Sequence, residues 1–113
     1  MTIYAQGDIL IERVKSAPSG VRVDRDPDGA VVLARGEATG HRHAIHGDNA
    51  VMFRDDGLAR DLDRSLYIGH VVVGKGGADL RHEEHGTIHL PKGTYRIRRQ
   101  REWDVGEARI VAD

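Results

Sequence analysis

Turn-forming residues punctuate this chain at short intervals along its length. They stand at Gly7-Asp8, Pro18-Ser19-Gly20, Pro27-Asp28-Gly29, Asp56-Gly57, Gly74-Lys75-Gly76-Gly77 and Pro91-Lys92-Gly93. Glycine accepts the positive φ angles that many turns require, and proline fixes φ at a value that initiates them. Most of the intervals between these turns suit short strands better than helices, so the sequence predicts an all-β fold.

Short runs rich in apolar and β-branched residues lie between these turns. They are Asp8–Val14, Val21–Arg25, Ala30–Ala34, Ala50–Arg54, Leu66–Val73, Thr87–Leu90 and Thr94–Gln100. Several alternate apolar and polar residues, as half-buried strands do. The run 66–73 is the most apolar and is predicted to be a central strand, with a bulge or a close backbone approach at Gly69. The runs on either side of the turn at 26–29 predict a hairpin.

We therefore expect one β domain over residues 1–113, built as a small β-barrel or sandwich of about seven to nine short strands. Leu58, Leu62 and Leu66 recur at helical spacing, which allows at most one short helix near 58–66. Aromatic residues make up only 4% of the chain, so the core is modest. A thin core favours support from self-association, and we expect a homo-oligomer.

Composition excludes several classes of protein. The chain has no cysteine, so a disulfide scaffold, a zinc–thiolate site and a cysteine nucleophile are all ruled out. It has no run approaching the roughly 20 apolar residues of a membrane helix, and no secretory pattern at its start. We expect a cytoplasmic protein without membrane contact. The net charge of −1 argues against whole-molecule attraction to nucleic acid.

Six of the seven histidines fall in two short segments, HRHAIH at 41–46 and HEEHGTIH at 82–89. In an extended chain His41 and His43 point to the same face, where two imidazoles can chelate one ion. A turn after His82 would bring His85 back to the same side. We predict that these four histidines form one site. The other three are expected to have no direct role, and His70, inside the central run, is expected to be structural.

Two chemistries suit such a site. Neutral imidazole is the commonest side-chain ligand of divalent transition metals, here Zn, Fe, Ni or Mn, with Glu83 or Glu84 as a supporting carboxylate. Alternatively, two histidines can act without a metal, one as general base and the other as general acid. In that case His41, His43, His82 and His85 are the candidate catalytic residues, and no cofactor is needed.

The pattern G-x₄-H-x-H at 36–43 and the pattern H-G-x₃-L-P-x-G-x-Y at 85–95 are similar to the two motifs of cupins. The resemblance implies a small β-barrel in which His41 and His43 are metal ligands and 91–93 forms the turn of the second motif. Two positions depart from the family pattern. Gly47 stands where a cupin often carries a glutamate, and Tyr95 and Arg96 stand where its last histidine is expected.

The segment TYRIRRQREW at 94–103 is strongly basic. Its arginines are Arg96, Arg98, Arg99 and Arg101. Guanidinium groups bind phosphate through two hydrogen bonds at once, and Tyr95 and Trp103 could stack on bases. The segment therefore indicates a phosphate or nucleic-acid clamp. The alternative is a solvated strand whose arginines pair with carboxylates of the same chain.

Three functions stay open at this point, and the sequence does not decide whether the protein is an enzyme. The first is a metal-binding β-barrel that acts on a small molecule. The second is a metal-independent ribonuclease or phosphodiesterase that uses paired histidines, with the arginines holding an RNA phosphate. The third is a non-catalytic oligomeric binding module. No nucleophilic serine motif, phosphate-binding glycine loop or dinucleotide fingerprint is present.

Overall fold

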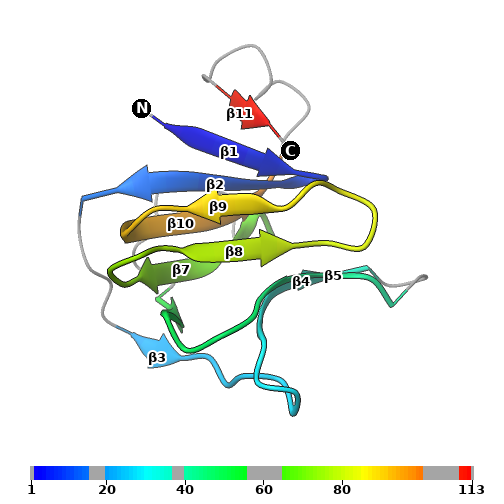
Figure 1. Cartoon of the computed structure of the whole chain (residues 1–113). Helices are drawn as coiled ribbons and strands as arrows, with labels where there is room; N and C mark the ends of the chain where they lie inside the picture. The colour runs from blue at the N-terminus through cyan, green and yellow to red at the C-terminus, as the bar shows by residue number, and fades with distance from the viewer. Residues whose placement is uncertain (1, 16–19, 37–39, 56–64, 101–109, 113) are drawn as a thin grey trace.

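The computed structural model of the chain describes residues 2–15, 20–36, 40–55, 65–100 and 110–112 (Figure 1). These residues form eleven strands in two sheets, and none of them is helical. The all-β prediction is therefore confirmed. The predicted short helix near 58–66 falls mainly on residues outside the described ranges, and Ser65 and Leu66 lie in a turn. Within the described ranges no helix could cross a membrane.

The larger sheet has seven strands and the smaller sheet has four. In spatial order, the larger sheet contains β11 (Ile110–Ala112), β1 (Ile3–Gln6), β2 (Ile9–Val14), β10 (Gly93–Arg99), β7 (Tyr67–Val73), β6 (Ala50–Arg54) and β3 (Val21–Arg22). The smaller sheet contains β4 (Val31–Arg35), β5 (Arg42–Ile45), β8 (Ala78–Arg81) and β9 (Ile88–Leu90). Neighbouring strands are antiparallel except β1 and β11, which are parallel.

The strand count exceeds the predicted seven to nine. The strands that no predicted run covers are β1, β5, β8 and β11, of three or four residues each. A strand this short shows at most two alternations of apolar and polar residues, too few to stand out from a loop. Such strands are fixed by their neighbours: β1, for example, pairs with β2 from Ile3↔Glu12 to Gln6↔Ile9.

The two sheets pack face to face around one apolar core (Figure 1). The larger sheet contributes Ile9, Ile11, Val71, Val73, Tyr95 and Ile97, and the smaller sheet contributes Leu33, Ile45, Leu80, Ile88 and Leu90. Complete burial of one large aliphatic or aromatic side chain stabilises a fold by about 1.5–3 kcal/mol. Two sheets that share a core make a β-sandwich, which is one of the two predicted architectures.

The most apolar run forms β7, which lies between β10 and β6 as a central strand, as predicted. Its register against β10 shifts at Gly69, because Ile97 faces Gly69 while the next residue of β10 faces Tyr67. A Cβ atom at Gly69 would lie 2.7 Å from Cε of Met52 and 2.9 Å from the Phe53 carbonyl oxygen. The bulge and the close backbone approach predicted from this glycine are both present.

The predicted hairpin over 21–35 is wrong, although its turn is present. The Gly29 amide donates a hydrogen bond to the Asp26 carbonyl at 2.8 Å. However, β3 pairs with β6 in the larger sheet, whereas β4 pairs with β5 in the smaller one. The guanidinium group of Arg25 donates to the carbonyls of Gly29 and Gly47, both at 2.7 Å, and ties the segment to the loop before β6. The turn thus carries the chain from one sheet to the other.

Three parts of the chain that are distant in sequence meet at one end of the sandwich, at the right of Figure 1. They are the turn between β1 and β2, the start of β5, and the connection between β8 and β9. Each comes from a different strand pair, so the sandwich topology alone brings them together. This end holds His41 and His43 of one histidine-rich segment and His82 and His85 of the other.

Candidate functional site

The two histidine-rich segments of the sequence meet at this end. His41 and His43 lie at the start of β5, and His82 and His85 lie in the connection between β8 and β9. The ring centre of His82 is 4.2 Å from that of His43, 4.7 Å from that of His85 and 5.6 Å from that of His41. The rings of His43 and His85 are 6.3 Å apart. The four residues, here called the histidine cluster, therefore lie together with His82 at their centre.

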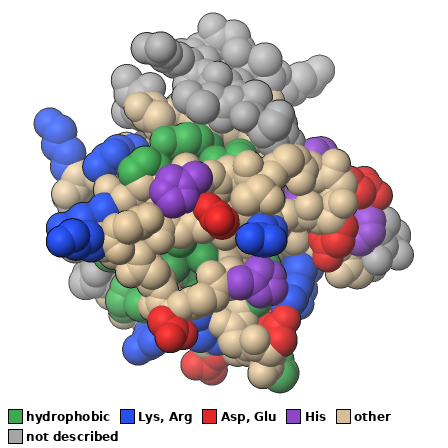
Figure 2. Space-filling model, in the orientation of Figure 1, with side chains coloured by type: hydrophobic (Ala, Val, Ile, Leu, Met, Phe, Trp, Pro, Cys, Tyr) green, Lys and Arg blue, Asp and Glu red, His purple; other side chains and the backbone are tan. Residues whose placement is uncertain are grey.

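The histidine cluster lines a surface cleft of about 620 Å³. The other lining residues are Gly7, Asp8, Ala34, Arg35, Gly36, Glu84 and Arg99. Figure 2 shows histidine side chains beside acidic ones at the right-hand edge of the molecule, the same end as in Figure 1. Besides the imidazoles, the lining contains two arginines and two carboxylates, so formal charges of the two signs balance there.

His43 is the most enclosed of the ligand candidates, with a side chain only 7% exposed. Its Nδ1 lies 2.9 Å from Oε1 of Gln6, which is fully buried at the end of β1. Its Nε2 lies 3.9 Å from Oδ1 of Asp8. Burial, together with the neighbouring His82 ring, lowers the pKa of His43 to about 4. His43 is therefore neutral at pH 7, the form in which imidazole binds a metal or accepts a proton.

Carboxylates stand beside the other imidazoles. Nδ1 of His41 lies 3.4 Å from Oε1 of Glu84. Potential ligand atoms of His41, His82 and Glu83 all lie within 4.8 Å of one another, and this is the single such group of three in the described ranges. Glu83 accepts the Arg42 backbone N–H at 2.9 Å, and this hydrogen bond lowers the pKa of Glu83. An ionised Glu83 is thus held next to two imidazoles.

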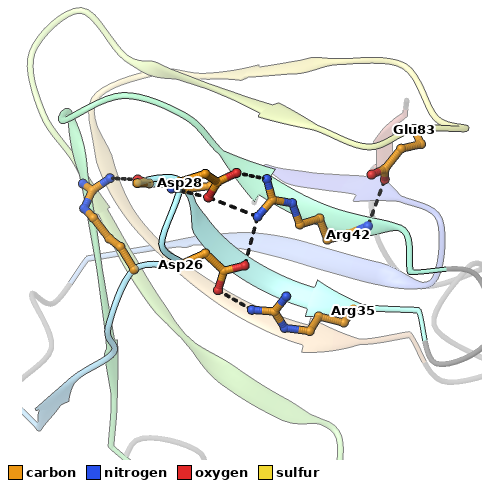
Figure 3. A network of polar contacts seen from close by, with 8 residues as sticks. Asp26, Asp28, Arg35, Arg42 and Glu83 are labelled. Carbon is orange, nitrogen blue, oxygen red and sulfur yellow. Dashed lines mark hydrogen bonds and ion pairs between the residues drawn. The ribbon is translucent and has the colours of Figure 1, made fainter.

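An ion-pair network holds the start of β5 in place (Figure 3). The Arg42 guanidinium group binds Asp28 and Oδ2 of Asp26, the latter at 2.9 Å, while Arg35 binds the other oxygen of Asp26. The hydrogen bond from Arg42 lowers the pKa of Asp28 to about 2. Because the backbone N–H of Arg42 binds Glu83, the network connects the turn at 26–29 to the connection between β8 and β9 (Figure 3).

Sequence reasoning missed the turn between β1 and β2 as part of the site. Gly7 has a φ of +58°, and a Cβ atom there would lie 2.9 Å from Nε2 of His85 and 3.2 Å from Cε1 of His43. Glycine alone lets this turn pack so closely against two imidazole rings. The dipeptide Gly7-Asp8 signals a turn, but no local pattern connects it with histidines far along the chain.

The structure separates the arginines that the sequence places in one row. Nε of Arg96 and Nε of Arg98 both donate to Oε1 of Glu12 on β2, at 3.0 and 2.8 Å. Arg98 and Glu12 are buried, and neither Arg96 nor Arg98 lines the cleft. Arg99 does line it and donates to Asp8 at 3.2 Å. The predicted four-arginine clamp is therefore reduced to Arg99 at the cleft, and Arg101 lies outside the described residues.

The other three histidines lie away from the cleft lining. His70 is buried, and its Nδ1 is 2.8 Å from the Tyr67 hydroxyl, a structural position of the kind predicted for it. Burial lowers the pKa of His70. Nδ1 of His89 lies 2.8 Å from Oδ1 of Asp79 on an exposed part of the smaller sheet, and His46 is exposed.

One family model matches this chain over residues 5–100, and its description is "Domain of unknown function (DUF8820)". The matched span includes the histidine cluster and the turn between β1 and β2. The chain belongs to the DUF8820 family. No curated protein and no solved structure matches it.

The spacing of part of the histidine cluster in this DUF8820 protein is compatible with one shared metal ion. Imidazole nitrogens bind Zn²⁺ at about 2.0–2.1 Å, so two rings on one ion have centres roughly 4.5–6.4 Å apart for bond angles of roughly 90–180°. Three of the four separations, from 4.7 to 6.3 Å, lie in this range, whereas the 4.2 Å between His43 and His82 is shorter. The ligand atoms that lie within 4.8 Å of one another are those of His41, His82 and Glu83. The same cleft could also support acid–base chemistry, because His43 is neutral and Arg99 is close enough to face an anionic substrate.

Proposed function

We propose that this protein binds a divalent transition metal ion at the histidine cluster and presents it to a small molecule in the cleft. The observation that carries the proposal is the convergence of four imidazole rings from two distant segments around His82. Four imidazoles this close together would repel one another if they were protonated, so chance alone would not be expected to gather them in one cleft. Coordination of one cation by several neutral imidazoles would explain why these residues lie together.

The chemistry of the ligands indicates the kind of metal. Neutral imidazole suits Zn²⁺, Fe²⁺ or Ni²⁺, and Mn²⁺ is accepted where carboxylates take part. Glu83 and Glu84 stand beside His41 and supply the carboxylate that a cupin often carries at the position of Gly47. A set of two imidazoles and one carboxylate, such as His41, His82 and Glu83, would leave a coordination position open, as catalytic rather than structural sites do.

A second candidate is metal-independent cleavage of a phosphodiester, with histidines as general acid and base. Two observations favour it. Burial keeps His43 neutral at pH 7, the form in which an imidazole can act as a general base. Arg99 in the cleft lining is placed to bind a phosphate oxygen.

The metal proposal is tested on untagged protein by measuring metal content after purification and the melting temperature with added ions. We expect bound Zn, Fe, Ni or Mn near one equivalent. An ion present at 100 times its Kd should stabilise the metal-free protein by about 2.7 kcal/mol. Mg²⁺, which prefers oxygen ligands, is the control and should leave the melting temperature unchanged. Absence of bound metal together with no shift from any of the four ions would overturn the proposal.

The second candidate is tested by incubating single-stranded RNA with the protein in EDTA across pH 5–9. It predicts cleavage with a bell-shaped pH profile, abolished by the double substitution His43→Ala and His85→Ala. A His46→Ala, His89→Ala protein, which keeps the cleft intact, is the matched control. RNA that stays intact in EDTA, or cleavage that survives the first double substitution, rules this candidate out.

A further inference from the structure

Gln6 is a fully buried polar side chain at the end of β1, next to the turn that packs on the histidine rings. Its amide nitrogen donates to the carbonyl oxygens of Leu80 and Gly86, at 3.0 and 2.9 Å. Its amide oxygen lies 2.9 Å from Nδ1 of His43. One side chain thus connects β1 with β8, with the β8–β9 connection and with the most enclosed imidazole of the cleft.

These contacts fix the orientation of the Gln6 amide. Carbonyl oxygens only accept hydrogen bonds, so the NH₂ group of Gln6 must face Leu80 and Gly86. The amide oxygen must then face His43, and it also can only accept. Nδ1 of His43 is therefore the donor, which places the proton of the neutral ring on Nδ1 and leaves the lone pair on Nε2.

We infer that Gln6 is a positioning residue that locks His43 in the Nδ1–H tautomer and so aims the Nε2 lone pair at the cleft. This inference deepens the proposed metal site, and it rests on that proposal only for its affinity readout. Carboxamide or carboxylate groups that hold the second nitrogen of a ligating histidine fix its tautomer and orientation in the same way. Gln6 would do so from within the core, where water cannot compete for the hydrogen bond.

The surroundings of Nε2 agree with a cation as the occupant. Oδ1 of Asp8 lies 3.9 Å from Nε2, and an ionised carboxylate offers only acceptors. With the proton of His43 on Nδ1, neither Nε2 of His43 nor an ionised Asp8 carboxylate carries a hydrogen, so the two groups cannot hydrogen-bond to each other. A cation between them would turn this acceptor pair into two favourable contacts, and two ligands about 2.0–2.2 Å from one Zn²⁺ can be this far apart.

His82 contrasts with His43. The backbone N–H of Glu84 can only donate, so Nδ1 of His82 accepts and its neutral ring carries the proton on Nε2. The two adjacent rings, 4.2 Å apart, thus have opposite tautomers in the metal-free protein. Nε2 of His43 already has its lone pair available, whereas Nδ1 of His82 must lose its hydrogen bond from Glu84 before it can become a ligand.

The direct test is a long-range ¹⁵N–¹H correlation spectrum of metal-free protein at pH 7.5, which distinguishes protonated from unprotonated ring nitrogens. We expect His43 with its proton on Nδ1, His82 with its proton on Nε2, and the exposed His46 averaging between tautomers. A spectrum that shows His43 protonated on Nε2 would overturn the inference. Because this measurement uses no metal, it can fail or succeed whatever the outcome for the proposed function.

Two substitutions separate a tautomer lock from a merely structural role. Gln6→Glu keeps an oxygen that accepts from Nδ1 of His43 but loses the donors to the two carbonyls. Gln6→Met loses both. We expect His43 to keep its Nδ1–H signature in Gln6→Glu and to lose it in Gln6→Met. Identical His43 spectra in the two variants would contradict the lock, and the wild-type spectrum decides the question if neither variant folds.

The affinity readout uses Zn²⁺ as the probe. Removal of a group that orients a metal ligand typically lowers affinity by about 10- to 100-fold, so Gln6→Met should weaken Zn²⁺ binding within that range. Gln6→Glu should weaken it less. If both variants bind Zn²⁺ as wild type does while the spectra behave as expected, the lock holds but His43 is not a ligand. If wild type binds no Zn²⁺, it is the proposed function that fails.

Discussion

The histidine cluster and the group formed by Glu12, Arg96 and Arg98 are both dense in polar side chains. They differ in the partners that these polar groups have. Glu12 lies opposite Arg96 in the strand register and accepts from both arginines, so its carboxylate is paired within the fold. The imidazoles of the histidine cluster lie against one another and beside Gln6, Glu83 and Glu84, and they line a cleft. We infer that the first group is structural and that the second is built to receive a ligand.

Glu12→Ala should produce the largest effect and should confine it to stability. It removes the carboxylate shared by two arginines, one of them buried, and the loss of one partner from a buried ion pair typically costs about 3–5 kcal/mol. The free energy of unfolding in urea measures this. Glu84→Ala, whose side chain is 66% exposed, is the matched control and should cost under about 1 kcal/mol. A cost for Glu12→Ala as small as that of the control would remove the distinction between the two regions.

Gly7→Ala should change metal binding in the cleft more than it changes the stability of the fold. The new methyl group would lie 2.9 Å from Nε2 of His85, so the imidazole must move, and we expect Zn²⁺ affinity to fall about tenfold. Gly76→Ala is the control, because Gly76 also has a positive φ, +92°, but nothing lies within 4 Å of its added Cβ. Both variants carry backbone strain of about 1 kcal/mol, which urea unfolding measures. Equal Zn²⁺ affinities in the two variants, determined by calorimetry, would show that the turn does not position the ring.

His70 gives the smallest of these effects, on the pH dependence of stability. Burial, with Arg96 nearby, lowers its pKa in the folded state, so between its folded and unfolded pKa values only the unfolded chain binds the proton. The stability contributed by neutral His70 is complete above pH 6.5, the unfolded value, and is lost as the pH falls below it.

His70→Gln should therefore flatten the fall in unfolding free energy between pH 7 and pH 5, by at most about 1.4 kcal/mol per pH unit. Urea unfolding at several pH values measures the slope. His46→Gln, at an exposed position, serves as the control and should leave it unchanged. A steeper slope in His70→Gln would mean that the folded protein prefers a protonated His70.

Much of the fold was predictable because its signals are local. The apolar run of β7, the bulge at Gly69 and the alternation in the first part of β10 are visible within a few residues. The pairing of β3 with β6 was not predictable, because long-range contacts decide it. A turn sequence such as the one at 26–29 specifies a reversal of the chain, but not whether the next strand stays in the same sheet.

The candidate site shows the same limit. The four histidines could be selected from spacing and residue type, but their meeting depends on the sandwich topology. The arginine row was misleading because residue type does not reveal that Glu12 lies opposite Arg96. Gln6 and Gly7 had no signal of their own, since a glutamine at a strand end and a glycine in a turn are ordinary in sequence and acquire a role only through His43 and His85.

The most direct test of the account is calorimetric titration of Zn²⁺ into untagged, metal-free protein. It predicts one ion per chain for wild type and for the His46→Ala, His89→Ala control. It also predicts loss of that binding in a His41→Ala, His82→Ala protein, which removes two imidazoles that are not fully buried and should melt at a temperature near that of the metal-free wild type. Equal Zn²⁺ affinity in the two double variants, or no Zn²⁺ binding by wild type, would contradict the claim that the histidine cluster is a metal site.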